Sequence, residues 1–317
     1  MIATGDIHVT RPWKIAIVGF GKIACEQHRP AIADSPDFQL AAIISSSAHA
    51  VDVPVFRTLE DAFASGLALD AVALCTPPQV RQEVCDLATA RGLAVLLEKP
   101  PAATVAQAQA LAAMGSSRGV TVFAGWHSRF APFVEEARTW CAAHDGLHGR
   151  IEWHEDHLKW HPGQAWLWQL GGLGVLDPGI NSLSILTVIR PGAWHLSGAA
   201  FEQPENADTP RAARFSLGRN GDHVDVSFRF AENTSETWSI QLRAENGDVL
   251  HLADGGAALS LNGGAFRRKA NAEYAGVYRR FAELMRSGQC DVDTAALCLT
   301  EEAFRTAEIT LVEPVTI

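Results

Sequence analysis

The sequence predicts an α/β protein of two domains, the first built on a parallel sheet and the second α+β with a large, mainly antiparallel open sheet. Short apolar runs alternate with helical patterns through residues 13–124, which predicts parallel βαβ units. Beyond residue 214 apolar residues recur at every second position, which predicts antiparallel strands with one buried face. Two turns of the Asn-Gly type separate these strands. We therefore expect one domain over 1–124 and a second over 125–317.

In the first domain, predicted strands and helices follow one another along the chain. The strands are expected at 13–19, 38–44, 70–74, 93–97 and 120–124, and the helices at 23–33, 59–65, 80–91 and 105–114. Ligands of parallel sheets bind beyond the carboxyl ends of the strands, and all five strand ends carry residues suited to a ligand. The residues that we expect at a bound cofactor are Gly19, Gly21, Lys22, Ile23, Ser45, Ser46, Thr76, Pro77, Pro78, Glu98, Lys99 and Trp126.

The first strand runs into the glycine-rich segment Gly19-Phe20-Gly21-Lys22-Ile23-Ala24. Gly19 permits a tight turn, Gly21 lets backbone N–H groups approach a pyrophosphate, and Ala24 allows close helix–sheet packing. The amino end of the following helix favours the negative charge of a phosphate. Because the segment follows a strand and opens a helix, it predicts a Rossmann dinucleotide-binding domain.

The end of the second strand indicates which dinucleotide is used. An acidic residue about 20 positions beyond the glycines would hold the ribose 2′-OH of NAD. Ser45, Ser46 and Ser47 occupy that place, and no arginine stands beside them. Neutral hydroxyls neither bind the ribose diol strongly nor repel a 2′-phosphate, so we predict that both NAD and NADP are used.

Aromatic and polar residues cluster at the start of the second domain. Four tryptophans lie within 153–168, interleaved with histidines and with Glu155 and Asp156. Core packing is the alternative for any single tryptophan, but such a cluster is typical of a sugar site, where aromatic rings cover C–H faces and polar groups bind hydroxyls. The three histidines, His154, His157 and His161, lack the spacing of a common closed zinc site, so no metal is expected.

A glycine-rich turn at 171–174 leads into a predicted helix with Asp177 and Asn181 on one face. The alternative for Asp177 is a helix cap. Lys99 follows a buried strand and precedes two prolines, which suits a positioned group, although exposed lysines are the rule. Two further helices are expected near 271–286 and 294–311.

These segments resemble the Gfo/Idh/MocA oxidoreductases. The glycine segment at 19–24, the Glu-Lys-Pro-Pro segment at 98–101 and the segment at 171–181 carry the resemblance. The segments at 126–129, 155–156, 159–164 and 171–181 look more closely like the group of L-arabinose and D-galactose 1-dehydrogenases.

The resemblance implies an aldose 1-dehydrogenase that oxidises C1 of a pyranose, such as L-arabinose, D-galactose or D-fucose, to the aldonolactone with NAD(P)⁺. It places Lys99 and Asp177 at the reacting centre, with either as the base. The residues that it places around the sugar are His127, Glu155, Trp160, His161, Asn181 and Trp238. Many family members have histidine where Asn181 stands, so a histidine acid–base role at that position is excluded here. A non-catalytic sugar sensor and a polyol or dihydrodiol dehydrogenase are the alternatives on the same fold.

Composition excludes other classes of protein. The formal net charge of −10 argues against nucleic-acid binding. The apolar stretch 171–189 contains Asp177, Pro178 and Asn181, which argues against a membrane span. Residues 1–12 lack the apolar core of a signal peptide, and the six cysteines form no CxxC pair, so we expect a cytoplasmic protein. The outer face of the antiparallel sheet is a candidate homodimer surface, with a solvated face as the alternative.

Overall fold

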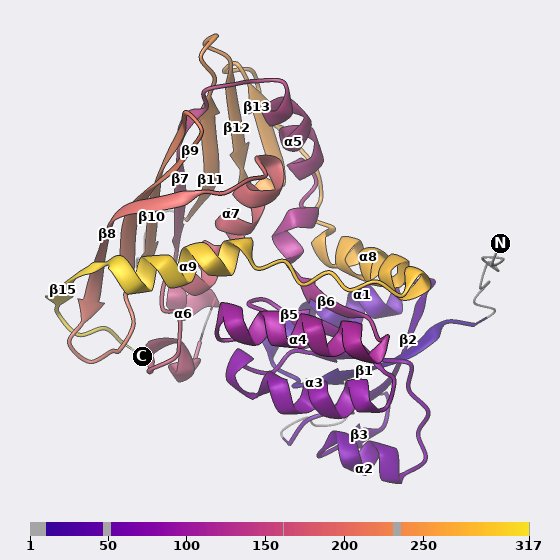
Figure 1. Cartoon of the computed structure of the whole chain (residues 1–317). Helices are drawn as coiled ribbons and strands as arrows, with labels where there is room; N and C mark the ends of the chain where they lie inside the picture. The colour runs from indigo at the N-terminus through magenta and orange to yellow at the C-terminus, as the bar shows by residue number, and fades with distance from the viewer. Residues whose placement is uncertain (1–10, 47–51, 161, 231–235, 317) are drawn as a thin grey trace. The chain divides into compact units, whose positions relative to one another are not determined.

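The computed structural model describes residues 11–46, 52–160, 162–230 and 236–316 (Figure 1). The chain divides into two compact units. The first comprises Met1–Trp126 and Tyr274–Asp293, and the second comprises His127–Glu273 and Thr294–Ile317. None of the helices in the described part of the chain combines the length and hydrophobicity needed to cross a bilayer.

The first unit contains a six-stranded sheet in the order β3-β2-β1-β4-β5-β6, in which every pairing is parallel. Its strands are β1 (Trp13–Val18), β2 (Phe38–Ile44), β3 (Val55–Phe56), β4 (Ala71–Leu74), β5 (Ala94–Glu98) and β6 (Val122–Gly125). The order reverses between β1 and β4, which is the switch point of a Rossmann sheet, where ligands bind. The predicted parallel sheet is confirmed.

Helices cover this sheet between the strands. They are the π-helix η1 (Ala24–His28), α1 (Arg29–Ala33), α2 (Leu59–Ala64), η2 (Pro78–Val80), α3 (Arg81–Ala90) and α4 (Val105–Arg118). A capping box between Thr58 and Asp61 begins α2, and Thr104 caps α4. The segment expected as one helix at 23–33 forms a π-helix that passes into α1.

The helix α8 (Glu273–Ser287) completes the core of the first unit, although it follows almost the whole second unit in sequence. The ring of Phe281 stacks on Phe38 with centroids 5.5 Å apart and lies 6.2 Å from Phe123. Because these partners come from β2 and β6, α8 ties together strands from both halves of the sheet.

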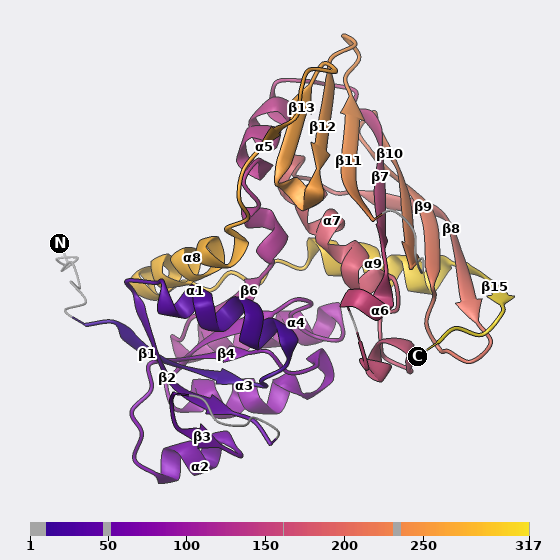
Figure 2. The same cartoon turned by 180° about the vertical axis from the view of Figure 1, so that it is seen from behind.

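The second unit contains a nine-stranded sheet in the order β14-β13-β12-β11-β7-β10-β9-β8-β15 (Figure 2). Its strands are β7 (His148–Glu155), β8 (His195–Pro204), β9 (Ala212–Arg219), β10 (Asp222–Phe230), β11 (Thr237–Arg243), β12 (Val249–Ala253), β13 (Ala258–Leu261), β14 (Arg267–Arg268) and β15 (Glu308–Val312). Among the described strands of this sheet, only the pairs β7·β10 and β8·β15 are parallel. Burial alternates along β10, so the expected antiparallel sheet with one buried face is confirmed.

The helices of the second unit are η3 (His127–Phe130), α5 (Val134–Ala142), α6 (His157–Trp160), η4 (Ala165–Trp168), α7 (Leu176–Ile189), η5 (Asp254–Gly256) and α9 (Ala295–Thr306). The central helix α7 approaches β10 closely, because a Cβ at Gly179 would overlap the ring of Phe228. At the end of α7, Arg190 forms an ion pair of 2.8 Å with Asp222, whose side chain is fully buried.

The expectation of a helix at 294–311 is wrong at its end. The helix α9 stops at Thr306, and Glu308–Val312 forms β15, which pairs in parallel with β8. Three of the four residues 309–312 are β-branched (Ile309, Thr310 and Val312), which favours a strand, and pairing with β8 outweighs the local helical pattern.

Candidate active site

The glycine segment after β1 combines a close approach to the neighbouring strand end with open space beside it. Gly19 has φ +86°, and a Cβ there would lie 2.9 Å from the backbone N of Thr76 and from its Cγ2. A Cβ added at Gly21 would meet nothing within 4 Å. Gly19 is therefore needed where the ends of β1 and β4 meet, whereas the space before Gly21 is open to a ligand. These residues fit a dinucleotide.

The two residues after Gly21 present contrasting side chains. Lys22 Nζ lies 2.6 Å from both carboxylate oxygens of Glu26, so the Lys22 ammonium forms an ion pair with a residue one helical turn further along the chain. Ile23 is 43% exposed, which leaves an apolar side chain at the open side of the loop.

The serines beyond β2 lie at the surface end of the sheet. The backbone N–H of Ser45 donates to the carbonyl of Phe56 on β3 at 2.9 Å, and Ser46 is exposed. Ser47 lies outside the described residues. The uncharged serine predicted at this strand end is therefore accessible to a ligand.

The end of β4 is held by a residue that sequence reasoning missed. Arg81 is 3% exposed and donates to the carbonyl of Thr76 at 2.9 Å from Nε and 2.6 Å from Nη2. Thr76 Oγ1 is buried without a hydrogen-bond partner among the described residues, an arrangement that is rare and found where ligands or water complete a site. Beside it Pro77 is exposed and Pro78 is buried.

At the end of β5, the carboxylate of Glu98 points into the protein. It is 7% exposed, and it accepts hydrogen bonds from Tyr274 OH at 2.8 Å, from His28 Nε2 at 3.1 Å and from the backbone N–H of Lys99 at 2.8 Å. His28 Nδ1 lies 2.8 Å from Tyr278 OH. The carboxylate of Glu98 thereby fixes the backbone from which Lys99 projects.

The buried network behind Lys99 shifts the pKa values of two of its members, His28 and Tyr278. Burial by itself would lower the pKa of His28, but Cys75, Tyr278 and Glu98 stabilise the imidazolium and raise its pKa well above the ordinary value of 6.5. Burial raises the pKa of Tyr278 to about 12, although His28 opposes the shift. The tyrosine therefore stays neutral, and the His28 ring lies between its hydroxyl and the Glu98 carboxylate. Both tyrosines of the chain, four residues apart on α8, belong to this network, and that spacing is the signal that would have found them.

In the second unit, His127 is held by a carboxylate. His127 Nδ1 lies 2.6 Å from Glu273 Oε2, and since a carboxylate only accepts, Nδ1 carries the proton. The backbone N–H of Glu273 donates to Asn271 Oδ1 at 2.8 Å. Glu273, which sequence reasoning missed, therefore sets the orientation of the His127 ring. At the end of β6 in the first unit, Trp126 is 2% exposed and its Nε1 donates to the carbonyl of Asp293 at 2.9 Å.

The structure brings three predicted sugar-site residues together at the ends of β7 and β11. Trp238 Nε1 donates to Glu155 Oε2 at 3.1 Å, and the rings of Trp238 and Trp160 meet edge to face at 5.6 Å. Trp160 Nε1 in turn donates to Glu236 Oε1 at 2.5 Å, while Lys159 pairs with the other oxygen of Glu236. The result is a wall of two aromatic rings beside a buried carboxylate. His161 lies outside the described residues.

Asp177 and Asn181 lie one turn apart on α7, which packs against β7 and β11. Asp177 is 4% exposed and lies in the first turn, where the helix dipole favours a negative charge. The interpretation of Asp177 as a helix cap is wrong, because α7 begins at Leu176 with Val175 in the cap position.

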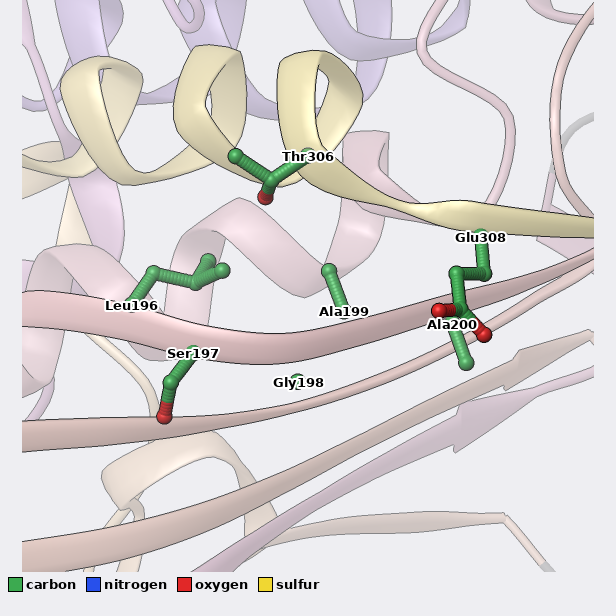
Figure 3. Close-up of a pocket in the computed structure, with 7 residues that line it drawn as sticks. All are labelled: Leu196, Ser197, Gly198, Ala199, Ala200, Thr306 and Glu308. Atoms are coloured by element: carbon green, nitrogen blue, oxygen red, sulfur yellow. The ribbon is translucent and has the colours of Figure 1, made fainter.

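A separate hollow of about 310 Å³ lies where α9 passes into β15, beside an irregularity in β8 (Figure 3). Its lining is mostly small and apolar, with Glu308 as the charged member. No residue predicted for the cofactor or sugar site belongs to this lining, so it is distinct from the catalytic candidates.

Comparison with known proteins identifies the family. The model of the Gfo/Idh/MocA oxidoreductase family with an NAD-binding Rossmann fold matches residues 13–126. A galactose 1-dehydrogenase from Pseudomonas fluorescens is 39% identical over 296 residues, which cover 93% of this chain and 95% of the relative. The crystal structure of a D-galactose 1-dehydrogenase from Rhizobium etli matches with a TM-score of 0.91 and 40% identity, over 96% of this chain and 98% of the other. A 3-ketoreductase from Actinomadura kijaniata in complex with NADP and TDP-benzene shares the fold, with a TM-score of 0.82 and 17% identity over 95% of this chain and 99% of its own. The chain therefore belongs to the Gfo/Idh/MocA oxidoreductase family.

Proposed function

We propose that this protein is an aldose 1-dehydrogenase that oxidises C1 of D-galactose to the aldonolactone with NAD⁺ or NADP⁺. The observation that carries the proposal is the match to galactose 1-dehydrogenases at 39% and 40% identity over nearly the whole chain. L-Arabinose and D-fucose share the ring configuration of D-galactose and differ around C5, so we propose them as further substrates.

The first unit is assigned to the coenzyme. The open space at Gly21 and the amino end of the following helix suit the pyrophosphate, and the buried hydroxyl of Thr76 lies at the neighbouring strand end. When bound, the coenzyme supplies the hydride-accepting nicotinamide. Ser45 and Ser46 present no charge that would select for or against a 2′-phosphate, which supports the use of both coenzymes.

The second unit is assigned to the sugar. The buried carboxylate of Glu155 can accept hydrogen bonds from sugar hydroxyls, and the rings of Trp160 and Trp238 suit the flat C–H face of a pyranose. His127, whose Nδ1–H is held by Glu273, and Asn181 supply further polar contacts, and we assign His161 to the same group.

The chemistry requires one proton transfer in addition to hydride transfer. The C1–H bond breaks with its electron pair as hydride, the anomeric O–H loses its proton, and C1=O forms. We assign the proton to Lys99 or Asp177, because the family resemblance implies a role for these two groups at the reacting centre. Lys99 is suited to this task because the Glu98 carboxylate fixes its backbone N–H.

A substrate panel tests the function. We expect D-galactose, L-arabinose and D-fucose to reduce the coenzyme, as followed by its absorbance, and Lys99→Ala to lower kcat by about a hundredfold or more. Turnover of inositols or dihydrodiols without aldoses would support a polyol dehydrogenase instead. Coenzyme binding without turnover of any aldose would support a sensor. For coenzyme choice, a ratio of kcat/KM above about a thousandfold, or some 4 kcal/mol, would contradict dual use.

We also propose that the outer face of the nine-stranded sheet forms a homodimer. The exposed side chains of β9 and β10 on this face form a polar lattice, including a hydrogen bond of 2.7 Å from Ser216 to Asp225. Light scattering after size exclusion should give twice the chain mass of 34.1 kDa, and a species of the single-chain mass would contradict the proposal.

A further inference from the structure

Arg81 joins the ends of two neighbouring strands in the first unit. It is the first residue of α3 and is 3% exposed. Its Nε and Nη2 donate to the carbonyl of Thr76, beyond β4, at 2.9 and 2.6 Å. Its Nη1 donates to the carbonyls of Glu98 and Pro100, at the end of β5. One guanidinium therefore binds backbone carbonyls in the segments that follow both β4 and β5.

The two carbonyls bound at β5 flank Lys99 in sequence. The backbone N–H of Lys99 itself donates to the Glu98 carboxylate at 2.8 Å. The peptide group that precedes Lys99 is thus held at both ends, at its carbonyl by Arg81 and at its N–H by the Glu98 carboxylate, and Arg81 also holds the carbonyl of Pro100 beyond Lys99. A backbone held in this way limits the positions that the lysine amine can take.

Only arginine has the geometry for this task. Its guanidinium is planar, stays charged and presents several donors in a fixed fork, whereas lysine offers a single flexible ammonium. Burying such a charge is costly unless it is well hydrogen-bonded. A buried guanidinium that binds the backbone at two strand ends indicates that the position of these ends relative to each other is important for the site.

We propose that Arg81 is a positioning residue, which holds Lys99 in register with the Thr76 strand end so that proton transfer and coenzyme binding occur in one geometry. The inference rests on the proposed role of Lys99. Misplacing a reacting group by about 1 Å can lower a rate about a hundredfold. Loss of Arg81 is therefore expected to act on kcat more strongly than on the KM for the sugar.

The experiment compares Arg81→Ala and Arg81→Lys with a matched control, Arg118→Ala. Arg118 binds the second half of α3, where it donates to the carbonyl of Asp86 at 2.9 Å and to Thr89 Oγ1 at 2.6 Å, away from both strand ends. Two readouts are taken on the full chain. Steady-state kinetics give kcat and KM with D-galactose, and amide hydrogen exchange reads the peptides around Thr76 and Lys99.

We expect Arg81→Ala to lower kcat about a hundredfold, with a smaller change in KM. We also expect amide exchange to accelerate at the Thr76 and Lys99 peptides and not along α4. Arg81→Lys should fall between Arg81→Ala and the wild type, and it serves as the test variant if Arg81→Ala does not fold. Arg118→Ala should match the wild type in both readouts.

Three results would overturn the proposal. One is a kcat of both Arg81 variants within about threefold of the wild type, which is a change in activation free energy of under about 1 kcal/mol. Another is a lowered kcat with wild-type exchange at Lys99, and the third is exchange that accelerates evenly over the unit, which indicates a structural role alone. If the wild type oxidises no aldose, the proposed function fails, and exchange confined to the two strand ends still decides the role of Arg81.

Discussion

Replacing Gly19 by alanine puts a methyl group where the first unit has no room for one. The added Cβ would lie 2.9 Å from the backbone N of Thr76 and 3.0 Å from the carbonyl carbon of Cys75, on a residue with φ +86°. The left-handed conformation costs an L-residue about 1–2 kcal/mol, and overpacking costs about 1–3 kcal/mol. We therefore expect Gly19→Ala to lower the free energy of unfolding by about 2–5 kcal/mol.

Gly21→Ala is the matched control, because a Cβ at Gly21 meets nothing within 4 Å. Alanine at an unstrained position reduces the entropy of the unfolded chain, so stability is expected to stay equal or to rise by up to about 1 kcal/mol. The same methyl group enters the space assigned to the pyrophosphate. We therefore expect the Kd of NAD(P)H to rise about tenfold or more, which corresponds to about 1.4 kcal/mol.

Thermal unfolding and coenzyme titration by fluorescence separate the two effects. At about 2–4 °C per kcal/mol, Gly19→Ala should melt about 4–20 °C below the wild type, whereas Gly21→Ala should melt with it. A Gly19→Ala protein with an unchanged melting temperature would refute the steric argument. A stable Gly21→Ala protein with wild-type coenzyme affinity would refute the placement of the pyrophosphate.

Three further predictions concern buried charges and the aromatic wall. Burial would raise the pKa of Asp222, but Arg190 and the other groups that donate hydrogen bonds to Asp222 lower this pKa. The carboxylate therefore stabilises the fold above pH 3.8, the ordinary pKa of aspartate, and this stabilisation is lost as the pH falls through the lowered pKa. Asp222→Asn should cost about 3–5 kcal/mol near neutral pH and less in acid, as measured by urea unfolding; an acid-independent difference would contradict this. For His28 the pH dependence of stability is reversed. Its pKa is raised, so its stabilisation is complete below pH 6.5 and is lost as the pH rises through the raised value. The free energy of unfolding of His28→Gln should therefore differ most from that of the wild type below pH 6.5. Glu236→Ala removes the acceptor of the Trp160 indole N–H. The loss of one hydrogen bond, worth about 0.5–1.5 kcal/mol, should raise the KM for D-galactose about 2- to 12-fold and leave kcat little changed. A lowered kcat at constant KM would contradict a role of these rings in sugar binding.

The fold was predictable where local pattern and local structure coincide. The strands β1, β2, β4, β5 and β6 lie within two residues of the expected ranges, because each is a short apolar run bounded by polar or turn residues. The two-residue strand β3 is too short to show a period. The parallel pairing of β7 with β10 joins segments far apart in sequence, and no local pattern encodes such a partner.

The sequence suggests the residues of the candidate site but not the contacts among them. Glu155 and Trp160 stand in the motif segments, Trp238 is implied by the family resemblance, and the structure brings the three together. The supporting residues were missed because most of them act through a partner distant in sequence, and Arg81 acts on backbone carbonyls, which no side-chain pattern marks. They are His28, Arg81, Glu236, Glu273, Tyr274 and Tyr278.

The position of α8 in the chain has a consequence for synthesis of the protein. During translation, the nascent first unit emerges without the helix that stacks Phe281 on Phe38 and supplies the Tyr274 hydroxyl to Glu98. It stays incomplete until nearly the whole second unit has left the ribosome. A gene fragment ending at Trp126 would encode the entire parallel sheet. It would leave Phe38 without the ring that stacks on it and the Glu98 carboxylate without the hydrogen bond from Tyr274. The nucleotide-binding half of this enzyme is therefore not a module that can be cut out and transplanted by itself.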